Sequence, residues 1–206
     1  AGFEVEKIII NSNLTEEEAF AAEASLINAF NYVGDAGLTN IVAGHLSAEA
    51  LSVDEYERIN GAAPLEKKDI RHKILVIKIN RLYQRGMDEK VLYDAVRGVW
   101  RVSKEKVRTV EYVFGVYNSL IVAVYKPSEW FVCKEAKDRL PRQDIVLTPK
   151  TENRLFFVDE RYEQGFPLDE NESFYIGKSI AGLKLNQSAQ NPITYLYPLE
   201  KDKIHI

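Results

Sequence analysis

The strongest constraint on the fold is a pair of runs rich in β-branched and aromatic residues. Residues 111–117 (EYVFGVY) and 120–125 (LIVAVY) flank the polar dipeptide Asn118-Ser119. Valine and tyrosine favour extended backbone, and a two-residue polar turn between such runs is typical of an antiparallel hairpin. These two runs are the strongest strand signal in the chain.

Periodicity and capping residues predict helices and further strands on both sides of the hairpin. The predicted strands cover residues 4–11, 73–80, 154–160 and 173–177, and the predicted helices cover residues 16–30, 52–60, 87–98 and 104–109. Helices and strands in this order are typical of an α+β fold. The later part of the chain is therefore expected to form a mixed β-sheet or a small β-barrel with helices.

The segment INGAAPLEKKD, residues 59–69, is the expected domain boundary. It separates a domain over residues 1–62 from a domain over residues 70–206. One strand and about one long helix cannot bury their apolar faces alone, so residues 1–62 are expected to dock on the second domain, on a second copy of the chain, or on a missing upstream segment. The chain begins without methionine, which predicts a processed product or a piece of a longer protein.

Composition and charge exclude several classes of protein. The single cysteine, Cys133, excludes an internal disulfide framework, and we expect a reducing, cytoplasmic location. No apolar run approaches the roughly 20 residues of a membrane span, so no membrane partner is expected. The net charge of −4 hides an asymmetry, because residues 1–60 hold two basic and eleven acidic residues whereas residues 64–108 hold thirteen basic and six acidic residues.

Metal and nucleophile signatures are weak in this sequence. His45, His72 and His205 are scattered, without the spacing of a zinc site. Cys133 follows an apolar run, which predicts a raised thiol pKa rather than a reactive thiolate. The GKS tripeptide beginning at Gly177 lacks the earlier glycine of a phosphate-binding loop.

One acidic residue stands out on the predicted helix over residues 16–30. Thr15 and Glu18 form a capping box at its start. At about 100° per residue, Glu23 falls within about 60° of apolar residues that include Leu26 and Phe30. The pattern therefore predicts a carboxylate that points inward from the middle of the apolar stripe, and such a carboxylate is expected to serve a function.

The stretch TEEEAFAAEASLINAF followed by GLTNIVAG resembles the last part of the GIY-YIG nuclease domain. The resemblance implies that Glu23 binds the divalent metal, Mg or Mn, of a bacterial DNA endonuclease, and that Asn40 ends a structural turn. The region with VLYDAVRGVWRVSKEKV, EYVFGVYNSLIVAVYKPSEW and YIGKS is similar to the segment that follows this domain in the LEM-type bacterial branch.

The chain departs from the nuclease pattern before Glu23. The family's active site uses two hairpin tyrosines and a helical arginine that precede the metal ligand, and residues 1–22 contain neither tyrosine nor arginine. The chain is therefore expected to be the C-terminal portion of a nuclease and to be inactive alone, so enzymatic activity depends on residues outside it. Tyr117 and Tyr175, which sit in fragments that mimic the family motif, are interpreted as ordinary strand residues.

The stretch RGVWRV suggests a surface that contacts DNA or RNA, because Trp100 lies between Arg97 and Arg101 in the sequence and can stack on a base while the guanidinium groups hold phosphate. The candidate nucleic-acid-binding residues are Arg97, Trp100, Arg101, Lys104, Lys106 and Arg108. The alternative interpretation makes Trp100 and Trp130 core anchors and the arginines surface ion pairs.

Two functions besides the nuclease fragment follow from these patterns. The first is a non-catalytic reader of nucleic acid or modified bases, similar to the PUA and EVE modules. The second is a protein-interaction module whose first strand and helix complete the fold of another chain.

Overall fold

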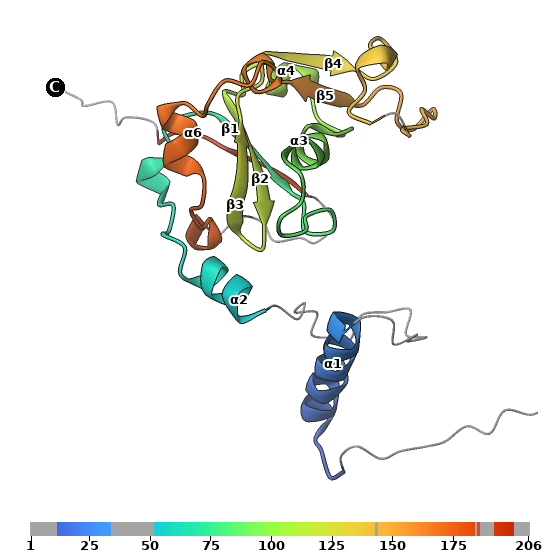
Figure 1. Cartoon of the computed structure of the whole chain (residues 1–206), viewed down its shortest axis with the longest axis vertical. Helices are drawn as coiled ribbons and strands as arrows, with labels where there is room; N and C mark the ends of the chain where they lie inside the picture. The colour runs from blue at the N-terminus through green and yellow to red at the C-terminus, as the bar shows by residue number, and fades with distance from the viewer. Residues whose placement is uncertain (1–11, 34–51, 143, 184, 186–191, 200–206) are drawn as a thin grey trace, which may run out of the picture. The chain divides into compact units, whose positions relative to one another are not determined.

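The computed structural model describes residues 12–33, 52–142, 144–183, 185 and 192–199 (Figure 1). The chain divides into two compact units, Ala1–Arg58 and Ile59–Ile206. The predicted strand over residues 4–11 and the turn at Asn40 lie outside the described residues. No helix in the described ranges combines the length and apolar character needed to cross a membrane.

Helix α1 (Glu16–Val33) begins as the capping box predicted. The Glu18 backbone N–H donates to Thr15 Oγ1 at 3.3 Å, and the Thr15 backbone N–H donates to Glu18 Oε2 at 2.9 Å. Helix α2 (Val53–Asn60) follows Ser52, whose hydroxyl accepts from the Glu55 backbone N–H at 3.2 Å. These bonds satisfy N–H groups that have no partner within the helix, and both predicted helix starts are confirmed.

The second unit is built on a four-stranded mixed sheet. Its strands are β1 (Ile74–Lys78), β2 (Tyr112–Tyr117), β3 (Leu120–Tyr125) and β6 (Ile193–Leu196). Their order is β3-β2-β1-β6, with β1 parallel to β2 and both outer pairs antiparallel. The prediction of an α+β fold with a mixed sheet is confirmed, and the described strands do not form the barrel offered as its alternative.

The hairpin between β2 and β3 turns at the predicted dipeptide. Asn118 and Ser119 have φ angles of 44° and 67°, and Tyr117 pairs with Leu120. Positive φ at both central residues is the signature of the turn whose twist matches that of two antiparallel strands. Asparagine tolerates this backbone, so the local sequence specifies the turn.

The parallel connection from β1 to β2 passes through α3 (Glu89–Arg97) and α4 (Lys104–Val107). The Asp88 side chain caps α3 by accepting from the Lys90 N–H at 2.8 Å, and the Ser103 hydroxyl accepts from the Lys106 N–H at 3.4 Å. Both helices lie where the sequence predicts them.

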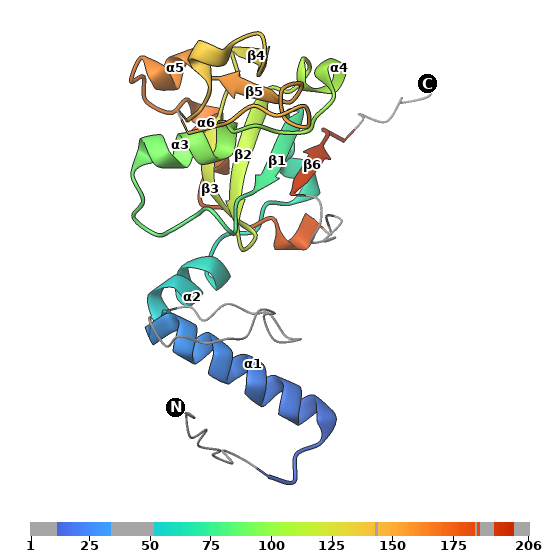
Figure 2. The same ribbon diagram turned by 90° about the vertical axis from the view of Figure 1, so that its right-hand side faces the viewer.

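The sheet has an apolar layer on each face. Alternate residues of β1 divide between the two layers, Ile74 and Val76 on one side and Leu75 and Ile77 on the other. Helix α3 packs on the second side, and α6 (Glu170–Tyr175) covers the first (Figure 1, Figure 2).

A smaller sheet pairs β4 (Glu129–Val132) with β5 (Leu155–Val158). Short helical segments complete the unit: η1 (Lys67–Asp69), η2 (Lys137–Arg139), α5 (Glu160–Glu163) and η3 (Ala181–Leu183). Cys133 is fully buried beside this sheet, and burial raises the pKa of its thiol, as the sequence predicted.

The predicted strand over residues 173–177 is wrong. Ser173–Tyr175 form the end of α6 because Asp169 and Glu172 make a second capping box at its start. Tyr175 is consequently not a strand residue, whereas Tyr117 is one. The buried Tyr175 ring anchors the end of α6, with its hydroxyl oxygen 2.9 Å from His72 Nδ1.

Candidate functional site

Glu23 does not point inward from α1. Its side chain is exposed, as is that of Phe30, whereas Ala24 and Ile27 are buried. At about 100° per residue, the buried face is therefore centred about 70° from Glu23. The prediction of an inward carboxylate is wrong, because the apolar residues around this helix are spread widely enough to fit more than one buried face.

Metal binding by Glu23 stays a prediction from the resemblance. The described residues contain no group of three or more His, Cys, Asp or Glu side chains that could hold a metal ion. The structural turn assigned to Asn40 lies outside the described residues.

Arg97 is held by carboxylates within the protein. Its Nε donates to Asp94 Oδ1 at 2.7 Å and a terminal nitrogen donates to Glu163 Oε1 at 3.3 Å. The guanidinium also lies over the Tyr93 ring, 4.8 Å from its centre, and the residue is buried. These contacts fit the ion-pair interpretation, so we leave Arg97 out of the candidate surface.

Trp100 is a core anchor. Its indole N–H donates to the Val96 carbonyl at 2.7 Å, and its backbone pairs with that of Leu155 in both directions, at 2.8 and 3.0 Å. The half-buried ring packs against the apolar layer beneath α3. Trp100 therefore does not offer a free ring face between two guanidinium groups, and it too is left out of the candidate surface.

The other four predicted residues are exposed around α4. Val107 is fully buried and fixes one side of this short helix against the core, which leaves its lysines in solvent. The four exposed cations are Arg101, Lys104, Lys106 and Arg108.

Two tyrosines of the C-terminal segment extend this cationic region. Lys106 Nζ lies 5.7 Å from the centre of the Tyr195 ring. The Tyr195 and Tyr197 rings are inclined by only 18°, with their centres 6.5 Å apart. Figure 2 shows α4 near the end of β6. We call this region the α4–β6 surface, formed by Arg101, Lys104, Lys106, Arg108, Tyr195 and Tyr197.

Sequence reasoning missed the two tyrosines. The alternation in ITYLYPL places Tyr195 and Tyr197 on one face of an extended segment, so the sequence alone predicts that the two rings lie side by side. The proximity of Tyr195 to Lys106 could not be predicted in this way, because it depends on the pairing of β6 with β1, as in the Ile74 to Leu196 register.

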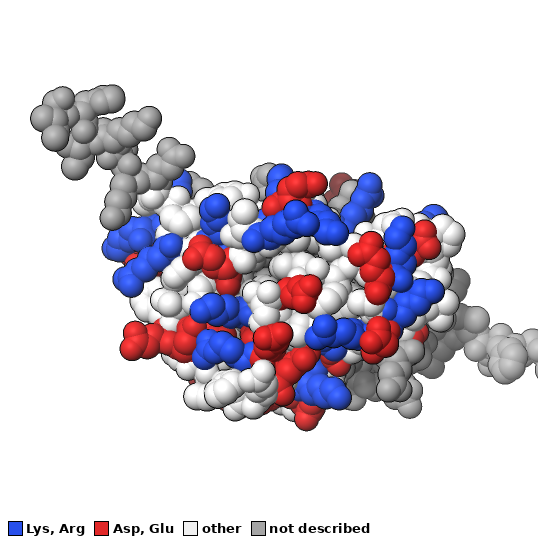
Figure 3. Space-filling model, turned by 90° about the horizontal axis from the view of Figure 1, so that it is seen from above, with Lys and Arg blue, Asp and Glu red and all other residues white. Residues whose placement is uncertain are grey.

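Acidic residues are interspersed with the cations at this end of the molecule. Figure 3 shows lysine and arginine side chains alternating with aspartate and glutamate on the visible face. Within α4, Glu105 lies between two lysines, and the hydrogen bond from the Ser103 hydroxyl lowers the pKa of its carboxyl. The α4–β6 surface is thus locally cationic rather than part of a large area of one sign.

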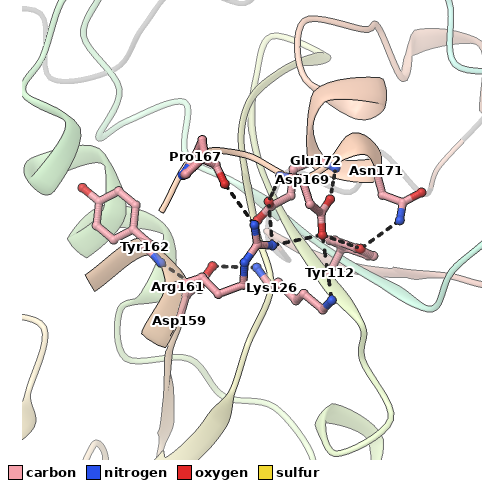
Figure 4. Close-up of polar contacts among 9 residues, drawn as sticks. All are labelled: Tyr112, Lys126, Asp159, Arg161, Tyr162, Pro167, Asp169, Asn171 and Glu172. Carbon is pink, nitrogen blue, oxygen red and sulfur yellow. Dashed lines mark hydrogen bonds and ion pairs between the residues drawn. The ribbon is translucent and has the colours of Figure 1, made fainter. Parts of the chain in front are cut away.

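A second polar cluster surrounds Arg161 (Figure 4). One terminal nitrogen lies 3.0 Å from Asp169 Oδ2 and 3.2 Å from Glu172 Oε2, and the other donates to the Pro167 carbonyl at 2.9 Å. The Tyr112 hydroxyl donates to Asp169 Oδ2 at 3.2 Å. The guanidinium therefore joins the start of α6 to the preceding loop, and Asp169 extends the cluster to Tyr112 of strand β2.

The carboxyl groups of this cluster have shifted pKa values. Desolvation by burial raises the pKa of Glu172, which is 4% exposed. For Asp169, desolvation is opposed by hydrogen bonds from Glu172 and Tyr112 and by the charge of Arg161, and the net effect lowers the pKa of Asp169. Both carboxylates also cap α6, so their contacts are those of a structural junction.

Asp159 belongs to the same kind of junction at the start of α5. Its carboxylate accepts from the Lys126 and Tyr162 backbone N–H groups at 2.8 and 3.1 Å, and burial raises the pKa of this side chain. The Tyr93 hydroxyl accepts from the Asp159 N–H at 2.7 Å, and burial raises the pKa of Tyr93. Shifted pKa values accompany structural networks as well as active sites. Both Asp159 carboxylate oxygens already accept backbone hydrogen bonds, so we interpret this group as structural.

Comparison of the chain with protein-family models, with curated proteins and with solved structures found no significant match. The GIY-YIG resemblance therefore stays a prediction from the sequence.

Proposed function

We propose that the unit Ile59–Ile206 binds nucleic acid through the α4–β6 surface. One observation carries the proposal, namely the contact of Lys106, one of four exposed cations in and beside α4, with the first of two nearly parallel tyrosine rings. Cations that follow a phosphate backbone beside rings that accept bases are the usual components of a nucleic-acid-binding surface.

The charge distribution sets the expected strength of this binding. Four cations neutralise at most about four phosphates, and interspersed acids such as Glu105 reduce the local potential. We therefore expect moderate affinity that falls with added salt. The network around Arg97 contributes only to the stability of the surface, since this guanidinium is occupied by Asp94 and Glu163.

The test is a titration of fluorescently labelled oligonucleotides, followed by anisotropy, with the 206-residue chain at about 50 mM salt. The double variant Lys104→Ala/Lys106→Ala removes two exposed cations and is expected to weaken binding about tenfold or more. The control Lys90→Ala/Lys150→Ala changes the net charge equally at two other exposed lysines. It is expected to bind within about twofold of the unchanged chain.

Thermal unfolding followed by circular dichroism verifies that both variants are folded. Equal weakening by the two variants would show that binding depends on net charge alone. Undetectable binding by the unchanged chain would also refute the proposal, and it would favour the protein-interaction interpretation.

A further inference from the structure

The Tyr197 ring is exposed at the end of the α4–β6 surface. The residue follows Leu196, the last residue of β6, and is 52% exposed. Tyr195 precedes it in the strand and is only partly exposed, with its hydroxyl oxygen buried. The pair is therefore an anchored ring followed by an open one, and the open ring offers apolar area to a ligand.

Two exposed lysines lie near the tyrosine pair. Lys106 lies over the Tyr195 ring. Lys73 precedes Ile74, which pairs with Leu196, so Lys73 and Tyr197 lie at the same end of two adjacent strands. The Lys73 side chain is exposed. A planar group stacked on Tyr197 would thus lie near two lysines that can contact its neighbouring phosphates.

Resting on the proposed function, we infer that the α4–β6 surface binds single-stranded nucleic acid with one base stacked on Tyr197. An unpaired base extends the nearly parallel arrangement of Tyr195 and Tyr197, and its flanking phosphates face the lysines. Stacking of this kind tolerates any base, because every base has a flat aromatic face.

A duplex does not satisfy the same geometry. Its bases are stacked on one another within the double helix and present only their edges in the grooves. The exposed Tyr197 ring cannot stack on a base that is already stacked inside a duplex, whereas an unpaired base of a single strand is free to stack on it. Specific recognition of a sequence is not expected from the rings alone, since they read a base face rather than its edge.

The test compares three single substitutions by anisotropy, using a labelled single-stranded oligonucleotide and the duplex of the same sequence. Tyr197→Ala is expected to weaken single-strand binding about 5- to 100-fold, whereas Tyr197→Phe keeps the ring and is expected to stay within about twofold. Phe166→Ala removes another exposed ring, 58% exposed in the loop before α6, and serves as the matched control. It is expected to have no effect.

The outcomes separate this inference from the proposed function. The duplex is expected to bind the unchanged chain more weakly than the single strand, and Tyr197→Ala is expected to leave duplex binding unaltered. Equal affinity for both nucleic acids, or full single-strand binding by Tyr197→Ala, would overturn the inference. If the inference about Tyr197 failed but Lys104→Ala/Lys106→Ala still weakened binding, the proposed function would stand. Failure of the unchanged chain to bind either nucleic acid would refute both the inference and the proposed function.

Discussion

Gly115 in the middle of β2 provides a direct test of how closely α3 approaches the sheet. A Cβ atom at this position would lie 2.5 Å from Val96 Cγ2 and 3.2 Å from Ala123 Cβ. Val96 is fully buried and Ala123 is 4% exposed, so neither neighbour can retreat without disturbing the core. Overpacking of this kind costs about 1–3 kcal/mol. We therefore expect Gly115→Ala to lower the free energy of unfolding by about 2 kcal/mol in urea denaturation.

The matched control removes the obstructing methyl group. Val96→Ala alone is expected to cost roughly 1–3 kcal/mol through lost apolar contact and a residual cavity. In that background Gly115→Ala is expected to cost under about 1 kcal/mol, which gives a coupling free energy of roughly 1–2 kcal/mol. Equal costs of Gly115→Ala in both backgrounds would refute the reasoning, because the cost would then not arise from the contact with Val96.

Two further substitutions test the polar junction and the hairpin turn. Arg161→Met is expected to destabilise the unit by about 1–3 kcal/mol at pH 7. This range is lower than that for a fully buried ion pair because the Arg161 side chain is 35% exposed and solvent screens its charge. Its charge helps to hold the pKa of Asp169 below the ordinary value, so this contribution is present above the unfolded-state pKa of Asp169 and is lost as the pH falls through the folded-state pKa. The loss measured by urea denaturation should therefore shrink toward acid pH, and an equal loss at neutral and acid pH would contradict this account. Ser119 has a positive φ of 67°, which glycine adopts without strain, so Ser119→Gly should raise the free energy of unfolding by about 0.5–1 kcal/mol. A lower free energy of unfolding in this variant would contradict the positive-φ turn at Asn118-Ser119.

Elements specified by adjacent residues were predictable from the sequence. Asp88 and Ser103 begin helices because their side chains accept hydrogen bonds within the next turn. The Asn118-Ser119 turn is equally local. The strand predicted at Ser173 failed because SFYIG has strand composition, while the capping box at Asp169 and Glu172 starts a helix immediately before it. Capping is the stronger local signal at this position.

The candidate surface depended on contacts that the sequence pattern does not contain. Arg97 and Arg101 look alike in the sequence, yet Arg97 meets Glu163, which lies 66 positions later and becomes adjacent only when α5 packs beside α3. Lys106 and Tyr195 are also distant in the chain and are joined by the pairing of β6 with β1. Glu23 shows the complementary difficulty, since a helix with apolar residues on much of its circumference does not define its own buried face.

The salt dependence of oligonucleotide binding tests the central claim most directly. If the four cations of the α4–β6 surface contact phosphates, the logarithm of the association constant should fall against the logarithm of salt concentration with a slope of about −3 for a single strand. Removal of Lys104 and Lys106 should reduce that slope to about −1.5. A slope near zero, or an unchanged slope in the Lys104→Ala/Lys106→Ala variant, would contradict the claim that this surface binds nucleic acid.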